Sequence, residues 1–426
     1  MKILVVGGGG REHALCWKIR KSPLVKQLFC APGNAGIAQE ADLVDIGAED
    51  ISALVDFVIE KAIDLVVVGP EAPLVAGLAD RLRAIGVSVF GPNSAAAQVE
   101  ASKAFTKELC DRANIPTARY GKFTDPESAK AFLDELSPPY VLKADGLAAG
   151  KGVVIPETRE DAEAEIDDMM SGKFGDAGKT LVIEEFLKGE EASFFALCDG
   201  TNAMPMIAAQ DHKRVHEGDK GPNTGGMGAY SPTPVANYSL ARQTMNEIIM
   251  PAIKTLANEG MPYSGVLFAG LMISEDGPKL IEFNARFGDP ECQIMMMRLL
   301  SDIVPYLKAC ADSELALMPP MSWHGSAAVT VVMAAKGYPN AYEKGTVIRN
   351  VENADALDQV TVFHAGTKRG TDGQLRSNGG RVLNVTAVGN SYREAIDRAY
   401  NAVDIIDWPN GFCRRDIGWR ALKDSS

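Results

Sequence analysis

The segment "KLIEFNARFGDPE" contains the residues best suited to do chemistry. Glu282 and Asn284 stand two residues apart in a predicted strand, so both side chains project from one face. A carboxylate and an amide oxygen form a hard-ligand set that suits Mg²⁺, with phosphate oxygens and water completing the coordination. Arg286 follows on the same face, where its guanidinium can hold an anionic substrate or transition-state charge. The alternative is an ordinary strand edge in solvent.

A second candidate site is the glycine-rich stretch "VLKADGLAAGKGV". It is not a Walker loop, because the Gly150-Lys151 pair follows Gly146 one residue early and Gly152 replaces the metal-binding hydroxyl. We expect Lys143 on a strand and Lys151 in a hairpin whose glycines let it fold over phosphates. A glycine-rich turn without a ligand fits this pattern equally well.

The stretch "GGGGREHA", residues 7–14, follows a predicted strand and opens a helix, where exposed backbone amides can bind an anion. Counting G-x-G-x-x-G from Gly7 places Glu12 at the third glycine, so the dinucleotide fingerprint is absent. Arg11 and His13 at the helix start favour a phosphate ligand over a simple tight turn.

The stretch "LVIEEFLKGEEAS", residues 181–193, ends a β-rich run with acidic residues. The backbone at a strand end can pair with the edge of adenine, and a nearby glutamate can accept hydrogen bonds from ribose hydroxyls. Taken alone, a solvated acidic turn is the favoured interpretation.

The elements that must position these segments indicate an α/β and α+β multidomain protein. The first hundred residues alternate β-rich runs with amphipathic segments, which predicts a Rossmann-like parallel sheet with ligand loops at the carboxyl ends of its strands. A second α/β region follows, in which Gly218 to Pro234 is expected to be a long ordered or lid-like loop. The last hundred residues predict a small antiparallel sheet with helices. The expected domains are 1–101, 102–325 with a lid subdomain at about 119–190, and 326–426.

The composition excludes several classes of protein. The net charge of -13 without a basic block argues against a nucleic-acid partner. Seven scattered cysteines without C-x-x-C pairs favour a reducing, cytoplasmic compartment over a disulfide framework or a structural zinc site. No apolar stretch reaches 18 residues, so we expect no membrane span.

Ten segments, in order, resemble the ATP-grasp superfamily and, within it, the glycinamide ribonucleotide synthetase (phosphoribosylamine-glycine ligase) family. They run from Gly9 to Ala421 and so cover essentially the whole chain. The segments are "GGREHAL", "APGNAG", "VGPEAPL", "SKAFTK", "KADGLAAGKGV", "EEFL.GEEAS", "QDHKR", "GPNTGGMGAYSP", "RFGDPE" and "CRRDIGWRA".

The resemblance implies ligation of glycine to 5-phosphoribosylamine in de novo purine biosynthesis, with ATP giving ADP and phosphate. It implies an ATP-grasp core with a mobile lid, a glycyl phosphate intermediate, and Mg²⁺ or Mn²⁺ as the metal. Positioning and charge neutralisation would supply most of the rate. The partners would be small molecules only, and the enzyme would be a stand-alone cytoplasmic monomer.

The resemblance also assigns roles to matching residues. It assigns contacts with ATP to Lys103, Lys143, Gly150, Lys151, Gly152, Glu184, Glu185, Phe186, Leu187 and Glu191. It assigns contacts with the other substrates to Gly9, Gly10, Arg11, Glu12, Gly33, Asn34, Asp211 and Arg286. It assigns catalytic roles to Arg286 and Lys213 and metal ligation to Glu282 and Asn284.

The chain departs from the family pattern at two places. The strand "VLFAGLMI" has no carboxylate before Glu275, so metal binding would rest on two protein ligands, and Gly8 stands where the family often has asparagine. Three alternatives stay open. They are another ATP-grasp ligase or carboxylase, which would lack the outer motifs, a nucleotide-binding regulatory module without turnover, and, weakest, an oxidoreductase.

Overall fold

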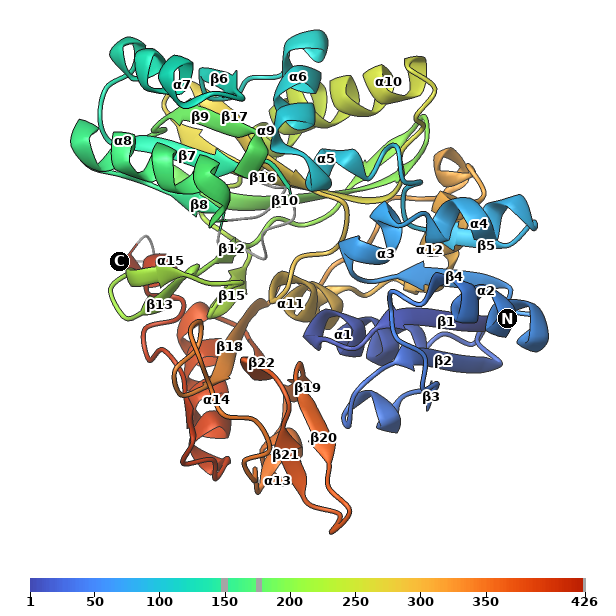
Figure 1. Cartoon of the computed structure of the whole chain (residues 1–426). Coiled ribbons are helices and arrows are strands. Elements are labelled where there is room, and N and C mark those ends of the chain that lie inside the picture. Colours follow the sequence, from blue (N-terminus) through green and yellow to red (C-terminus); the bar gives the residue numbers. More distant parts are fainter. Residues whose placement is uncertain (147–151, 174–177, 424–426) are drawn as a thin grey trace.

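The structure, a computed structural model, describes residues 1–146, 152–173 and 178–423. Within these residues the chain forms four sheets of four or more strands (Figure 1).

The N-terminal sheet is parallel, with the strand order β3-β2-β1-β4-β5. Its strands are β1 (Lys2–Gly7), β2 (Gln27–Pro32), β3 (Asp42–Leu43), β4 (Leu65–Val68) and β5 (Ser88–Phe90). Its helices are α1 (Gly10–Ile19), α2 (Ile51–Lys61), α3 (Glu71–Val75), α4 (Leu78–Ala84) and α5 (Gln98–Ala101). Val66 and Val68 enter one core cluster while Leu65 and Val67 enter another. Both faces of β4 are therefore covered, which explains its unbroken apolar sequence.

The largest sheet of the middle region is antiparallel, with the order β11-β10-β16-β17. Its strands are β10 (Glu190–Asp199), β11 (Ala203–Pro205), β16 (Ser264–Ser274) and β17 (Gly277–Asn284). The helices of this region include α6 (Lys103–Ala113), α9 (Tyr238–Thr244), α10 (Met250–Asn258), α11 (Glu291–Arg298) and α12 (Ile303–Ala311). Leu267 and Phe283 lie in the same core cluster as Leu4 and Val66, so this sheet and the N-terminal sheet share a core.

A smaller antiparallel sheet, with the order β6-β9-β7-β8, lies within the expected lid subdomain. Its elements are β6 (Tyr120–Phe123), α7 (Pro126–Phe132), β7 (Tyr140–Ala144), β8 (Val153–Val154), α8 (Arg159–Asp168) and β9 (Leu181–Glu185). Leu142, Ile166 and Ile183 belong to a core cluster confined to this region. The sheet is therefore stabilised largely by its own packing.

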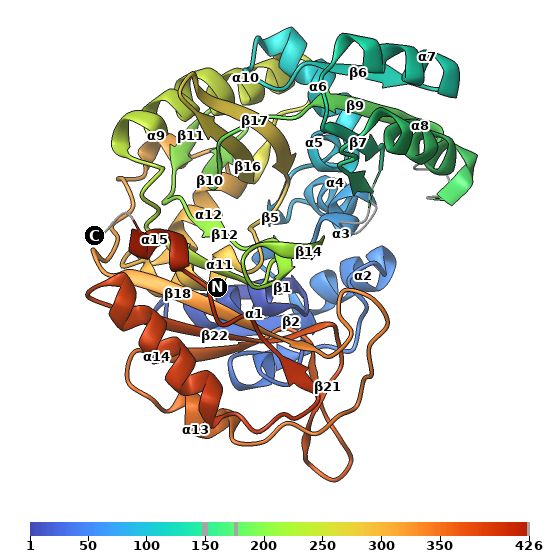
Figure 2. The same cartoon turned by 90° about the vertical axis from the view of Figure 1, so that its left-hand side faces the viewer.

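The C-terminal sheet has the order β12-β15-β18-β22-β19, with β23 also paired to β18. Its strands are β12 (Gln210–Asp211), β15 (Gly228–Ser231), β18 (Ala327–Ala335), β19 (Val360–His364), β22 (Arg381–Gly389) and β23 (Gly411–Phe412). The helices of this region are α13 (Val351–Asp355), α14 (Tyr392–Ile405) and α15 (Trp419–Lys423), of which α14 packs along β22 and β18 (Figure 2). Two hairpins complete the strands of the described residues: β13 (Arg214–His216) with β14 (Lys220–Asn223), and β20 (Thr367–Arg369) with β21 (Leu375–Ser377).

The segment from Gly218 to Pro234 differs from the expected loop, because it contains β14 and β15. A side chain at Gly228 would place its Cβ 2.6 Å from the carbonyl oxygen of Thr330, so glycine permits the close pairing of β15 with β18. Glycine-rich strands carry too few side chains to show a period of two, which is why the sequence did not predict them.

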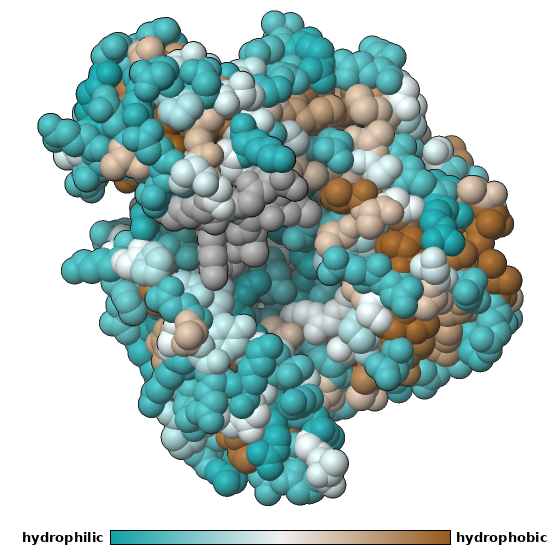
Figure 3. Space-filling model, in the orientation of Figure 1, coloured by the Kyte–Doolittle hydropathy of each residue, from teal (hydrophilic) through white to brown (hydrophobic). Residues whose placement is uncertain are grey.

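The observed architecture confirms the predicted fold class, an α/β and α+β multidomain protein. Figure 3 shows a hollow between the sheets that is bordered mainly by hydrophilic residues. In the described part of the chain, no helix is long and apolar enough to cross a membrane.

Candidate active site

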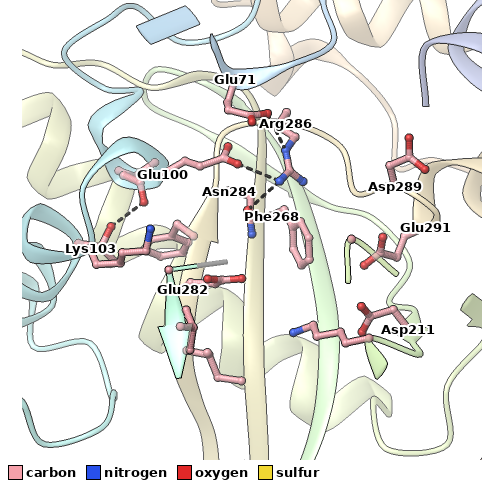
Figure 4. A pocket seen from close by; sticks show the side chains of 18 of the residues that line it. Glu71, Glu100, Lys103, Asp211, Phe268, Glu282, Asn284, Arg286, Asp289 and Glu291 are labelled. Carbon is pink, nitrogen blue, oxygen red and sulfur yellow. Dashed lines mark hydrogen bonds and ion pairs between the residues drawn. The ribbon is translucent and has the colours of Figure 1, made fainter. Parts of the chain in front are cut away.

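A pocket of about 480 Å³ lies where the N-terminal, middle and C-terminal regions meet (Figure 4). Figure 4 shows Lys103 and Glu282 on one side of it, and Asp211, Asp289 and Glu291 on the other. The sequence-predicted residues that line it are Arg11, Lys103, Gly152, Glu184, Asp211, Lys213, Glu282, Asn284 and Arg286.

The candidate metal ligands lie at the end of β17. Glu282 pairs with Gly270 and Asn284 with Phe268 across the β16–β17 ladder, and both side chains line the pocket. Their oxygens are hard donors on one face of a strand, so this pair fits a divalent cation that also binds phosphate oxygens. Among the described residues no group of three or more His, Cys, Asp or Glu side chains is arranged to hold a metal ion. Two protein ligands therefore require substrate and water to complete the coordination.

Arg286 lies directly after β17 and is held by carboxylates from the N-terminal region. Its Nη2 donates to Asn284 Oδ1 at 3.1 Å and lies 2.9 Å from Glu100 Oε1, while its Nε donates to Glu71 Oε2 at 3.3 Å. Burial raises the pKa of Glu100 despite Arg286. Burial would also raise the pKa of Glu71, but Arg286 and Arg11 outweigh it and lower that pKa. An anion that reaches Arg286 must compete with these two carboxylates.

Two lysines converge on a buried glutamate of the pocket lining. Lys143 Nζ lies 2.8 Å from Glu184 Oε1, and Lys107 Nζ lies 3.0 Å from Glu184 Oε2. Burial would raise the pKa of Glu184, but the two lysines outweigh it and lower that pKa. Lys103 Nζ donates to the carbonyl oxygen of Gly146 at 2.7 Å, and burial lowers the pKa of Lys103 although Glu282 opposes the shift. This end of the pocket therefore has Lys103 and Lys107 in its lining beside the Glu282–Asn284 pair, and Lys143 is bonded to the lining residue Glu184.

Acidic residues surround Lys213 at the opposite end. Lys213 Nζ donates to Glu191 Oε2 at 2.6 Å, and Glu291 Oε1 accepts a hydrogen bond from Ser193 Oγ at 2.8 Å. Burial would lower the pKa of Lys213, but Glu191 and Asp211 raise it well above its usual value. Burial raises the pKa of Asp211 to about 7, with Lys213 opposing the shift and Glu291 adding to it. This end can therefore neutralise a substrate cation and titrates near neutral pH.

The first turn of α1 presents one side chain to the pocket, that of Arg11. Glu12 is 2% exposed and accepts hydrogen bonds from the Gly9 amide at 2.6 Å and from Arg11 Nε at 2.7 Å. Arg11 Nη1 donates to the carbonyl oxygen of Phe287 at 3.1 Å. Burial would lower the pKa of Arg11, but Glu12 and Asp289 raise it, so the guanidinium stays charged.

Three consecutive parts of the chain match one family. Residues 1–100 match the phosphoribosylglycinamide synthetase N domain, residues 101–292 the ATP-grasp (A) domain of that synthetase, and residues 328–420 its C domain. The chain belongs to the phosphoribosylglycinamide synthetase family. This confirms the family resemblance of the ten sequence segments.

Named members of the family are similar over their full length. The chain is 59% identical over 422 residues to a phosphoribosylamine-glycine ligase of Mesorhizobium japonicum, covering 99% of each chain. It is 54% identical over 430 residues to the protein of that name from Escherichia coli K12, again covering 99% of each. A crystal structure of phosphoribosylamine-glycine ligase from Thermotoga maritima superposes with a TM-score of 0.85 at 32% identity, covering 98% of this chain and 100% of that one.

Several residues matched by the family motifs lie away from the pocket lining. Glu185 Oε1 accepts a hydrogen bond from the Arg119 amide at 3.0 Å, and Phe186 is 39% exposed on the segment after β9. The residues that do not line the described pocket are Gly9, Gly10, Glu12, Gly33, Asn34, Lys143, Glu185, Phe186, Leu187 and Glu191. Gly150 and Lys151 lie outside the described residues. Their ligand contacts stay predictions.

Asn34 and Gly8 determine how closely the loops after β1 and β2 approach each other. Asn34 Nδ2 donates to the carbonyl oxygens of Gly8 at 2.9 Å and His364 at 2.7 Å. A side chain at Gly8 would place its Cβ 2.6 Å from the carbonyl oxygen of Gly33. Glycine at position 8 therefore lets the loops after β1 and β2 approach closely.

Sequence reasoning missed six charged residues of the pocket. The sequence could have indicated Lys107, because it lies four residues after Lys103 and therefore on the same face of α6. Glu71, Asp289 and Glu291 stand inside segments that carry the family resemblance, without a role assigned to them. Glu100 and Arg381 have no local sequence feature that indicates a site. All six line the pocket.

Proposed function

We propose that this chain joins glycine to 5-phosphoribosylamine in de novo purine biosynthesis, with conversion of ATP to ADP and phosphate. The observation that carries the proposal is one pocket to which all three family regions contribute. Arg11 comes from the N region, Glu282 and Asn284 from the ATP-grasp region, and Arg381 from the C region.

We assign the nucleotide phosphates to the end of the pocket that is lined by Lys103 and Lys107, where Lys143 pairs with Glu184, and we assign adenine to the segment after β9. The support is the cluster of buried cations beside the Glu282–Asn284 pair. That pair would hold Mg²⁺ or Mn²⁺, which when bound neutralises phosphate charge. The lysines reduce the repulsion between ATP and an approaching carboxylate, so they lower the barrier through electrostatics.

We assign glycine to the opposite end. Its ammonium group would lie near Asp211 and Glu291, and its carboxylate would face the nucleotide. One carboxylate oxygen attacks the γ-phosphorus, ADP leaves, and glycyl phosphate forms. Arg286 would stabilise the charge on the transferred phosphoryl group once Glu71 and Glu100 release part of their hold on it.

We assign 5-phosphoribosylamine to the region around Arg11. Its amine attacks the carbonyl carbon of glycyl phosphate, loses a proton, and expels phosphate, which gives glycinamide ribonucleotide. The expelled phosphate keeps the oxygen that came from glycine. Exclusion of water from the pocket would protect the acyl phosphate until the amine arrives.

The deciding experiment measures ADP release with ATP, a divalent cation and glycine, with and without 5-phosphoribosylamine generated in situ. ADP that forms only when both co-substrates are present supports the ligase. ADP formed with a different acid or amine would keep the ATP-grasp chemistry and reject the glycine assignment, and ATP binding without turnover would indicate a regulatory module.

The intermediate has a separate test. With glycine labelled with ¹⁸O in its carboxylate, the released inorganic phosphate should carry one labelled oxygen per turnover. Unlabelled phosphate would exclude glycyl phosphate while leaving the overall ligation in place.

We further propose a cytoplasmic monomer without a nucleic-acid partner. The support is the set of seven free cysteines and the net charge of -13. Light scattering at working concentration should give 45.5 kDa, and a mass of twice that value would reject the monomer.

A further inference from the structure

Arg381, the first residue of β22, joins two backbone segments at the edge of the pocket. Its Nη1 donates to the carbonyl oxygens of Gly225 at 2.6 Å, Gly226 at 3.3 Å and Asp289 at 2.5 Å. The side chain is 21% exposed and lines the pocket. A guanidinium is planar and always charged, so it fixes the relative orientation of its acceptors better than a flexible ammonium does.

The first segment, the turn at residues 224–226, is bonded to Lys213. The amide and the hydroxyl of Thr224 each donate to the Lys213 carbonyl oxygen at 2.8 Å, and the Gly226 amide donates to Thr224 Oγ1 at 3.0 Å. Whatever holds this turn therefore also sets the position of the Lys213 backbone.

The second segment, at Asp289, is bonded to the first turn of α1, at Arg11. Asp289 Oδ2 accepts a hydrogen bond from the Arg11 amide at 3.1 Å, and Asp289 Oδ1 accepts one from Gln293 Nε2 at 3.0 Å. Arg381 Nη1 also lies 3.7 Å from Asp289 Oδ1. Burial would raise the pKa of Asp289, but Arg381 and Arg11 outweigh it and lower that pKa.

The turn is shaped to receive the guanidinium. A Cβ at position 225 would lie 2.9 Å from Arg381 Cζ and 3.0 Å from its Nη2. At position 226, where φ is +111°, a Cβ would lie 2.6 Å from Pro290 Cδ. Gly225 therefore lets the guanidinium lie against the backbone, and Gly226 permits the positive φ and the close approach of Pro290.

We propose that Arg381 is a positioning residue that sets the spacing between Lys213 and Arg11. This proposal rests on the proposed function, because Lys213 and Arg11 lie in the parts of the pocket that we assign to glycine and to phosphoribosylamine. Arg381 acts through the backbone of both loops, and its bonds do not reach the nucleotide end. The C-terminal region thus contributes to the acceptor chemistry without supplying a reacting group.

The test compares Arg381→Ala with Arg376→Ala in the full chain. Arg376 is a matched control, because it also lies in the C-terminal region and donates to a carbonyl oxygen, that of Gly345 at 3.0 Å, and to Asp372 at 2.7 Å. Hydrogen–deuterium exchange is followed in peptides covering residues 222–228 and 9–14, and KM is measured for each of the three substrates.

For Arg381→Ala we expect faster exchange at the amides of Thr224, Gly226 and Arg11. The kcat/KM for glycine and for phosphoribosylamine should fall by about 100-fold, the loss associated with misplacement of reacting groups by about 1 Å. The KM for ATP should not change, and Arg376→Ala should match the wild type in every measurement. Unchanged exchange in Arg381→Ala, or a parallel rise in the KM for ATP, would overturn the proposal.

Arg381→Lys separates positioning from charge. Because an ammonium lacks the planar fork, this variant should recover only part of the loss. Full recovery without restored amide protection would show that charge alone matters and would also overturn the proposal. If the wild-type chain does not consume glycine and phosphoribosylamine, the proposed function fails, and the exchange measurement still decides whether Arg381 positions the two loops.

Discussion

The two ends of the pocket are built in different ways. At the nucleotide end, Lys103, Lys143, Glu184 and the Glu282–Asn284 pair all come from the ATP-grasp region, and Lys143 and Glu184 contact each other directly. The opposite end, to which we assign glycine and phosphoribosylamine, is called the acceptor end below. There, Lys213 and Arg11 are held through backbone bonds that involve all three regions. Changes at the nucleotide end should therefore affect the use of ATP, whereas changes at the acceptor end should affect glycine or phosphoribosylamine and leave the KM for ATP unchanged.

Glu282→Gln should have the largest effect. The neutral amide weakens cation binding at β17, so kcat/KM for ATP should fall on the order of 10²–10³-fold, the range expected when one electrostatic contact to a transition state is lost. ADP release at saturating glycine and phosphoribosylamine measures this. Glu275→Gln, in the exposed turn before β17, is the control. Near-normal turnover of Glu282→Gln would remove the metal assignment.

Arg11→Ala should weaken the binding of phosphoribosylamine selectively. The KM for phosphoribosylamine should rise by roughly 10- to 100-fold, the loss expected for one charged hydrogen bond. The KM for ATP should stay constant. Arg20→Ala, just beyond the C-terminal end of α1 and 59% exposed, is the control. If the defect were confined to ATP, the phosphoribosylamine site would have to be moved elsewhere.

The pH dependence of glycine binding tests the role of Asp211 at the acceptor end. The pKa of Asp211 is raised to about 7, so this carboxylate loses its charge as the pH falls through about 7. Glycine, bound as a cationic ammonium, should then bind about 10-fold more weakly at low pH. Calorimetry with a non-hydrolysable ATP analogue measures this directly. Asp211→Asn should bind weakly at every pH, and an unchanged pH profile in that variant would assign the titration to another group.

Lys107→Met should have the smallest effect on turnover. It removes one of the two cations on Glu184, so Lys143 is drawn more strongly to Glu184 and less to phosphate. The KM for ATP should rise by about 5-fold, and the free energy of unfolding should fall by about 3 kcal/mol because a buried ion pair is broken. Denaturant unfolding and ATP kinetics check both values. Lys122→Ala, which breaks an exposed pair with Glu108, should change neither, and equal effects of the two variants would reject a special role for Lys107.

The difference between contacts within one region and contacts between regions explains what the sequence could predict. The spacing of Glu282 and Asn284 was sufficient to predict that their side chains lie together, because a strand places residues two apart on one face. The sequence could not show that Glu71 holds Arg286, because 215 positions separate them, or that Asp289 accepts from the Arg11 amide 278 positions away. Such contacts leave no periodic pattern, since they depend on how separate sheets are arranged. Gly225 was recognisable as a turn residue, but its partner Arg381 was not.

The pairing of β15 with β18 has a consequence for synthesis of the chain on the ribosome. Gly228 in β15 pairs with Val331 in β18, and β18 in turn pairs with β22. The part of this sheet that contains β15 therefore cannot be completed until β18 and β22 have been synthesised. The N-terminal sheet and the lid sheet can form earlier from their own sequences. A nascent chain that stops before β18 would carry the nucleotide-end residues, but Asp211 and Lys213 would lack the sheet that places them. Full activity should therefore appear only after β18 and β22 have been synthesised, later than the folding of the residues that we assign to ATP.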